Sequence, residues 1–272
     1  MKYAFSSNAF RKYSLVDTIG ILADIGYKGI EIMADTPHAY PPDLNGDHII
    51  KIKRALDKNG MVISNINAFM MHAEGDTWHP SWIEKEPDLR RRRIDHTLQC
   101  IDLAEKLGAS SISTEPGGPL DGIDPEEGGR LFLEGLLAVQ ARAREKGIRV
   151  LIEPEPDLLI ENSRQFMDFF KKLDPDVFGL NFDIGHFFCA GEEPSDLIPE
   201  MKDVIGHFHL EDIASSRVHH HLLPGDGAID LKKVLLSIKE IQYSGFVTVE
   251  LYPYGDKPIE AARLALNYLE NL

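Results

Sequence analysis

Eight apolar segments with strand character alternate with helical segments along the 272 residues, and this alternation most constrains the fold. Strands are expected at residues 3–6, 29–33, 62–69, 110–114, 149–153, 178–183, 204–209 and 246–250. Helices are expected at residues 14–25, 47–58, 89–107, 125–146, 163–173, 196–202, 231–241 and 258–271. This pattern predicts one α/β domain over residues 1–272 with the fold of a (β/α)8 TIM barrel.

An open, doubly wound sheet is the alternative arrangement of the same elements. That fold carries a glycine-rich phosphate turn after its first strand. Here Ser6-Ser-Asn-Ala-Phe10 follows the first expected strand, and it contains no G-x-G-x-x-G pattern. The closed barrel is therefore the favoured prediction.

Acidic residues or a histidine stand at the ends of four successive expected strands. Glu153 is followed at once by Pro154, which ends its strand because proline has no N–H for the ladder. Asp183, His209 and Glu250 end the next three strands. The C-terminal strand ends of a parallel barrel meet on one face and carry its chemistry. We therefore expect these four side chains to share one site.

Three carboxylates and one imidazole form a mainly oxygen ligand set. Such a set suits a divalent metal ion: manganese, magnesium or cobalt is favoured, and zinc also fits. The four residues lie too far apart in the sequence for a local metal loop, so the metal prediction depends on barrel closure. Each acid alone has a plain alternative as a helix cap or a surface ion-pair partner. His207, deeper on the strand face of His209, is expected to be a core histidine.

Charge and composition narrow the range of partners and locations. The formal net charge of −15 argues against a general nucleic-acid binder. No apolar run is long enough for a membrane span, and residues 1–5 lack the features of a signal peptide. Cys100 and Cys189 form neither a metal motif nor a disulfide framework. We expect a cytoplasmic protein that binds neither nucleic acid nor membrane.

The chain resembles the xylose isomerase-like barrels, in particular the sugar isomerase/epimerase group with ketose 3-epimerases, hydroxypyruvate isomerase and inosose dehydratase. The resemblance covers nearly the whole chain. It is carried by Glu153-Pro-Glu-Pro156, Asn181-Phe-Asp-Ile-Gly-His186, His207-Phe-His-Leu-Glu-Asp212, Leu223-Pro-Gly-Asp-Gly-Ala-Ile-Asp230 and Val249-Glu250.

The resemblance implies a divalent metal held by Glu153, Asp183, His209 and Glu250. It also implies that Glu153 and Glu250 move protons as the acid/base pair. His186 matches a family histidine that hydrogen-bonds a substrate oxygen. Arg217 matches the family arginine that follows the histidine ligand, and it is a further substrate-binding candidate.

Residues of a second rank can add to this site. His72 and Glu155 are candidate substrate-binding residues, each with an ordinary loop role as the alternative. Glu115 can line the pocket or simply end its strand before a Pro-Gly-Gly turn. The basic run 90–93 is expected to be a solvated helix face, and the His-His-His run 219–221 is expected to supply one pocket residue.

The sequence thus predicts an enzyme: a metal-dependent isomerase or epimerase acting on a ketose or related polyol ketone through an enediolate. An inosose dehydratase-type lyase on the same barrel is the first alternative. A metal-dependent apurinic-site endonuclease and a non-enzymatic binding module rank lower. The expected partner is an unphosphorylated small-molecule sugar, and the resemblance also suggests a homo-oligomer.

Overall fold

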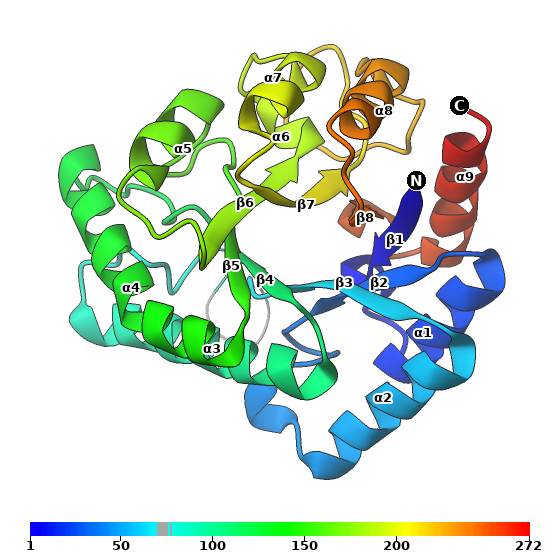
Figure 1. The fold of residues 1–272 in the computed structure, drawn as a ribbon, viewed down its shortest axis with the longest axis horizontal. Coiled ribbons are helices and arrows are strands. Elements are labelled where there is room, and N and C mark those ends of the chain that lie inside the picture. The colour runs from blue at the N-terminus through cyan, green and yellow to red at the C-terminus, as the bar shows by residue number, and fades with distance from the viewer. Residues whose placement is uncertain (70–75, 77) are drawn as a thin grey trace.

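A closed barrel of eight parallel strands forms the centre of the chain, in the order β1 to β8 (Figure 1). The computed structural model describes residues 1–69, 76 and 78–272. The strands are β1 (Lys2–Ser6), β2 (Gly29–Met33), β3 (Val62–Asn67), β4 (Ser111–Thr114), β5 (Arg149–Ile152), β6 (Phe178–Asp183), β7 (Ile205–Leu210) and β8 (Phe246–Val249). Strand β1 pairs with β8, with Ala4 opposite Thr248, and this pairing closes the ring. The predicted (β/α)8 barrel is confirmed, and the open sheet is excluded.

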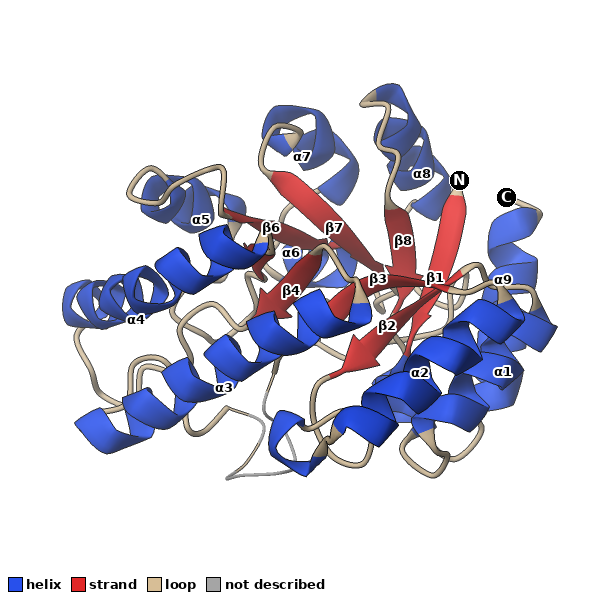
Figure 2. Cartoon of the chain, turned by 60° about the horizontal axis from the view of Figure 1, so that its bottom comes forward, coloured by secondary structure: helices blue, strands red, loops and turns tan. Residues whose placement is uncertain are grey.

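Helices surround the barrel and cover the outer face of its strands (Figure 2). The main helices are α1 (Leu15–Ile25), α2 (Gly46–Asn59), α3 (Pro87–Leu107), α4 (Pro125–Lys146), α5 (Ser163–Phe170), α7 (Pro194–Met201), α8 (Leu231–Glu240) and α9 (Pro258–Glu270). A short helix α6 (Ile184–Cys189) follows β6, and single 3-10 turns form η1 (Ser7–Phe10), η2 (Pro41–Asp43) and η3 (Tyr252–Tyr254). No described helix combines the length and the apolar character that a membrane span requires.

The ends of the helices follow from local sequence signals. In α4, the Asp124 side chain accepts hydrogen bonds from the backbone N–H groups of Glu126 and Glu127, and Pro125 occupies the first turn. Gly147 ends the helix in the left-handed region, with φ of 66°, where a side chain is disfavoured. Such caps set the lengths of the connections and so help to fix where each strand ends.

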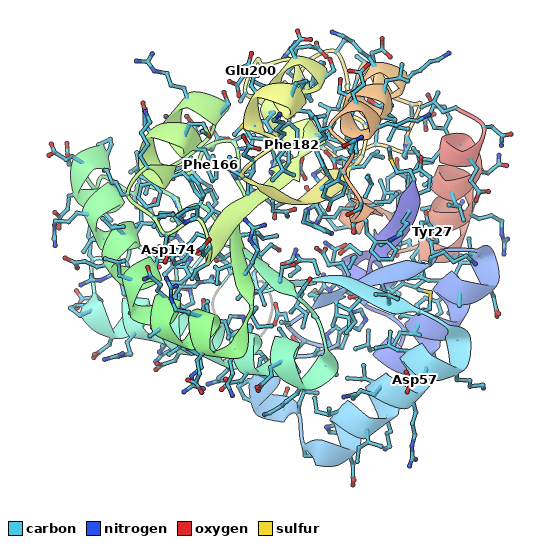
Figure 3. All side chains as sticks on the ribbon, in the orientation of Figure 1. Tyr27, Asp57, Phe166, Asp174, Phe182 and Glu200 are labelled. Atoms are coloured by element: carbon cyan, nitrogen blue, oxygen red, sulfur yellow. The ribbon has the colours of Figure 1, made fainter. Side chains whose placement is uncertain are left out.

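The core lies between the outer face of the barrel and the inner faces of the helices. Phe166 of α5 and Phe182 of β6 are fully buried there, whereas Asp57 and Glu200 lie exposed on outer helices (Figure 3). Burying an aromatic side chain of this kind contributes about 1.5–3 kcal/mol. The apolar layer therefore holds the wall of the barrel in place and leaves its C-terminal mouth for polar groups.

The basic run 90–93 does not form one solvated face. Arg91 and Arg92 are exposed, but Arg93 is fully buried and forms an ion pair with Glu115 at 3.0 Å. The same guanidinium donates to the backbone oxygen of Pro80 at 3.0 Å. The prediction is wrong for Arg93, because the turn of the helix places it on the inward stripe of α3.

Several element boundaries differ from expectation by one to three residues. The expected helix 163–173 ends at Phe170, and the expected strand 62–69 ends at Asn67. Helix α6 was not predicted, because six residues are too few to show a helical period. Its start is nevertheless fixed locally: the Asp183 side chain accepts a hydrogen bond from the His186 N–H at 2.7 Å.

Candidate metal centre

Four side chains from the ends of β5 to β8 converge inside the mouth of the barrel. Glu153, Asp183, His209 and Glu250 each offer a ligand atom, and these atoms all lie within 4.8 Å of one another. All four residues are buried. The structure therefore brings together the complete set of metal ligands expected from the sequence.

The imidazole of His209 lies at the centre of this cluster. Its Nδ1 is 2.8 Å from Glu153 Oε1, 3.7 Å from Asp183 Oδ2 and 3.7 Å from Glu250 Oε2. Asp183 Oδ2 is buried and accepts no N–H hydrogen bond from the described residues. Several acid oxygens around one imidazole nitrogen, one of them without an N–H donor, fit the ligand set of a divalent cation.

The electrostatics of the cluster point the same way. Burial alone would lower the pKa of His209, but the carboxylates of Glu153, Glu31 and Glu250 outweigh it and raise that pKa well above its ordinary value. Burial raises the pKa of Glu250 well above its ordinary range, and the neighbouring acids add to this effect. Without a metal ion, a proton on His209 thus supplies the positive charge that the acids require.

Glu31 of β2 is a member of this site that sequence reasoning missed. Its Oε2 accepts hydrogen bonds from His209 Nε2 at 2.8 Å and from Asn65 Nδ2 at 2.9 Å. With Nε2 hydrogen-bonded in this way, Nδ1 of His209 faces Glu153, Asp183 and Glu250. The sequence feature that could have identified Glu31 is its position as a carboxylate in the middle of the otherwise apolar strand Gly29–Met33.

Two asparagines orient the glutamates of the cluster. Asn181 Nδ2 donates to Glu153 Oε2 at 2.7 Å, and Asn8 Nδ2 donates to Glu250 Oε1 at 2.8 Å. The Asn181 oxygen also contacts Nδ1 of His207 at 2.9 Å, and Nε2 of His207 contacts Thr248 Oγ1 at 2.9 Å. Both ring nitrogens of His207 are thus occupied, which agrees with the expected role as a core histidine.

A cavity of about 340 Å³ opens above the cluster. Its described lining residues are Asn8, Arg11, Asn67, Phe69, Trp78, Glu153, Glu155, His186, His219, Glu250 and Tyr252. The volume lies at the lower end of the range for small-molecule sites. The two candidate catalytic glutamates therefore face a space that suits a small polar ligand.

The substrate-binding candidates are placed differently from one another. Glu155 and His186 line the cavity, and Glu155 Oε2 is buried without a hydrogen-bond partner among the described residues. Arg217 is not among the described lining residues: its guanidinium stacks on the Phe188 ring and donates to the Phe188 backbone oxygen. His72 lies outside the described residues.

Three further histidines form a second group of candidate ligands beside Asp183. His186, His219 and His221 each offer a ring nitrogen within 4.8 Å of the others. Nδ1 of His186 lies 3.0 Å from the Pro154 oxygen, and Nδ1 of His221 lies 3.0 Å from the Glu250 oxygen. Nε2 of His221 lies 3.2 Å from Nε2 of His219, and Nε2 of His186 faces Asp183 Oδ2 at 3.7 Å. A ligand of this group would therefore bind in place of the contact between His219 and His221. The run 219–221 contributes two residues to this group, where the sequence suggested one pocket residue.

Comparisons with known proteins agree with this geometry. The family model of the xylose isomerase-like TIM barrel matches residues 19–272. The chain is 24% identical over 281 residues to an inosose dehydratase of Clostridium beijerinckii, covering 92% of this chain and 86% of that protein. It is 26% identical over 251 residues to a fructoselysine 3-epimerase of Shigella flexneri, covering 90% and 88%.

Solved structures support the same fold. A D-tagatose 3-epimerase-like protein has a TM-score of 0.82 at 20% identity, covering 100% of this chain and 98% of that one. The IOLI protein with a bound zinc atom has a TM-score of 0.83 at 20% identity, covering 100% and 97%. With a family match over residues 19–272, the chain belongs to the xylose isomerase-like TIM barrel family.

Proposed function

We propose that this protein is a divalent-metal-dependent isomerase or epimerase that acts on a ketose or a related polyol ketone. One observation carries the proposal: Glu153 and Glu250 belong to one candidate metal cluster and also line the cavity above it. The relatives named as sugar epimerases and dehydratases support the same class of substrate.

Glu153, Asp183, His209 and Glu250 would hold the metal ion. When bound, a divalent cation stabilises negative charge that develops on a substrate oxygen. The ligand set fits manganese, magnesium or cobalt, and zinc is also compatible. The zinc atom named for one structural neighbour is consistent with a divalent ion of this kind.

The two glutamates would transfer the protons. In the barrel they follow β5 and β8, with β6 and β7 between them, so they approach the cavity from separate positions. Burial raises the pKa of Glu153 and of Glu250, which moves each carboxyl towards the range where it can exchange protons near neutral pH. One carboxylate removes the proton beside the ketone, and the other returns a proton to the opposite face of the same carbon in an epimerisation or to the neighbouring carbon in an isomerisation.

Other residues of the cavity would orient the substrate and limit its contact with water. Asn8 and Asn181 fix the carboxyl groups of the glutamates by hydrogen bonds. His186 and Glu155 present polar atoms to the cavity, and the apolar ring of Phe69 covers part of its wall. Side chains that are already held in position lower the entropic cost of bringing the substrate into its reactive geometry.

A dehydratase is the second candidate, and a specific observation favours it. The inosose dehydratase of Clostridium beijerinckii aligns with 92% of this chain. Dehydration would use the same base to remove a proton beside the ketone, and a second group would protonate the departing hydroxide. His186 lines the cavity, but burial lowers its pKa to about 3, so Glu153 or Glu250, whose pKa values burial raises, is the candidate for that group.

One experiment tests the proposed function and separates the two candidates. Metal-loaded protein is incubated in deuterated water with a panel of ketoses and with an inosose, and the products are followed by NMR and mass spectrometry. We expect metal-dependent deuterium at the carbon beside the ketone; an epimer identifies an epimerase, and loss of water identifies a dehydratase. Absence of both exchange and conversion in all reactions would contradict the proposal.

Matched variants assign the proton transfer. Glu250→Gln is expected to slow exchange by about 10²–10⁴-fold, the usual contribution of a general acid or base. The metal content of the variant is measured alongside, because Glu250 is also a candidate ligand. Glu145→Gln removes an exposed carboxylate of α4 and is expected to exchange at the parent rate.

A further inference from the structure

A second hollow adjoins the cavity above the metal cluster. It measures about 590 Å³ and shares Asn8, Arg11 and Tyr252 with that cavity. Its other described lining residues are Lys12, Thr36, Pro37, Pro253, Gly255 and Asp256. They follow β1, β2 and β8, and β1 and β8 lie side by side in the ring (Figure 1). A ligand in the first cavity can therefore extend along this side of the mouth.

Arg11 stands at the junction of the two hollows. It is the one lysine or arginine among the described residues that line the first cavity. Its side chain is exposed and has no ion pair or hydrogen bond with a described residue. The neighbouring Lys12 differs, because it pairs with Asp256 at 2.5 Å. The guanidinium of Arg11 is thus available to a ligand.

Arg11 matters for ligand binding because the other charged residues near it in the cavity are acidic. Glu153, Glu155 and Glu250 line the inner part of the cavity, and the whole chain carries a net charge of −15. The inner part of the cavity offers an anionic substituent acid side chains and no lysine or arginine among its described residues, whereas Arg11 would attract the same group. A guanidinium also presents paired donors that match a carboxylate or a phosphate. The polarity of the cavity therefore orients a ligand with one anionic end.

We propose that the substrate is a sugar or polyol ketone with an anionic substituent, a carboxylate or a phosphate, which Arg11 binds between the two hollows. The ketone end then faces Glu153 and Glu250. This inference rests on the proposed function, and it names the substrate class for that site. It replaces the unphosphorylated neutral sugar favoured by the sequence, which rested on the lack of a glycine-rich phosphate loop.

Binding to metal-loaded protein tests the inference without requiring turnover. The dissociation constants of D-fructose, D-fructose 1-phosphate, D-fructose 6-phosphate and 5-keto-D-gluconate are measured by ligand-observed NMR at low salt. We expect at least one charged ketose to bind about tenfold more tightly than D-fructose, in line with a charged hydrogen bond at an exposed site. The phosphate and carboxylate arms decide which anion is preferred.

Two charge-matched variants locate the effect. Arg11→Gln is expected to remove the preference for the charged ketose over D-fructose. Arg54→Gln, which removes an exposed cation of α2, is expected to keep the preference. The inference is overturned if no charged ketose binds more tightly than D-fructose, or if the preference survives in Arg11→Gln. Failure of the proposed function would instead appear as a lack of deuterium exchange in the parent protein.

Discussion

Replacement of Glu31 by glutamine tests how the candidate metal ligand His209 is held. In the parent protein, His209 Nε2 donates to Glu31 Oε2 at 2.8 Å, and this leaves Nδ1 directed at the acids of the cluster. Carboxylate partners of this kind orient a metal-binding histidine and increase its basicity. Glutamine retains an oxygen acceptor but loses the charge.

The expected loss of metal affinity follows from the change in this hydrogen bond. A hydrogen bond to a charged group contributes about 1.5–3 kcal/mol, and a neutral one contributes about 0.5–1.5 kcal/mol. The difference of about 1–1.5 kcal/mol corresponds to a roughly tenfold weaker metal affinity. This agrees with the lower end of the 10–100-fold losses that are typical of such partners.

The assay is a titration of metal-free protein with Mn²⁺, followed by calorimetry or by electron paramagnetic resonance of the free ion. Glu31→Gln is compared with Glu105→Gln, which removes an exposed carboxylate and changes the net charge equally. Thermal unfolding of both metal-free variants establishes that they are folded. An unchanged Mn²⁺ affinity in folded Glu31→Gln would refute the positioning role of Glu31.

Three further outcomes are expected. Because the pKa values of His209, Glu153 and Glu250 are raised, metal binding at pH 7 should release at least one proton, and the apparent metal affinity should rise with pH. Calorimetry in buffers of different ionisation enthalpy measures the release, and zero release would contradict this expectation. Gly185→Ala should destabilise the protein by about 1–3 kcal/mol, because a Cβ there would overlap Glu211 Oε1; an unchanged urea midpoint would argue against this tight contact. Burial, with Arg93 nearby, lowers the pKa of His96 to about 3. Neutral His96 therefore contributes stability that is fully present above about pH 6.5 and is lost as the pH falls towards 3. About 2 kcal/mol of the free energy of unfolding is lost by pH 5. His96→Gln should show a shallower decline in the free energy of unfolding between pH 6.5 and 5, and an equal slope would oppose this assignment.

The strand ends were predictable because local chemistry fixes them. Pro154 stops the strand before Glu153, and the Asp183 side chain caps the helix that begins at Ile184. In a parallel barrel these ends meet on one face, so the convergence of Glu153, Asp183, His209 and Glu250 followed from a correct fold class.

The partners of these residues were harder to predict, because they depend on which distant strands meet. Glu31 and His209 are 178 residues apart in the sequence, and barrel closure brings them into contact across the ring. The burial of Arg93 depends likewise on Glu115, which follows a different strand. Arg217 was placed by motif resemblance alone, and the structure directs its guanidinium to Phe188 and away from the cavity.

The binding of one divalent cation by Glu153, Asp183, His209 and Glu250 is the central claim. Its most direct test is a crystal structure of Mn²⁺-loaded protein, with an anomalous difference map collected at the manganese edge. We expect a peak within coordination distance of all four side chains, with Nδ1 of His209 as the ligand nitrogen. A fully loaded crystal without a peak among these four residues would contradict it, even if manganese were bound elsewhere.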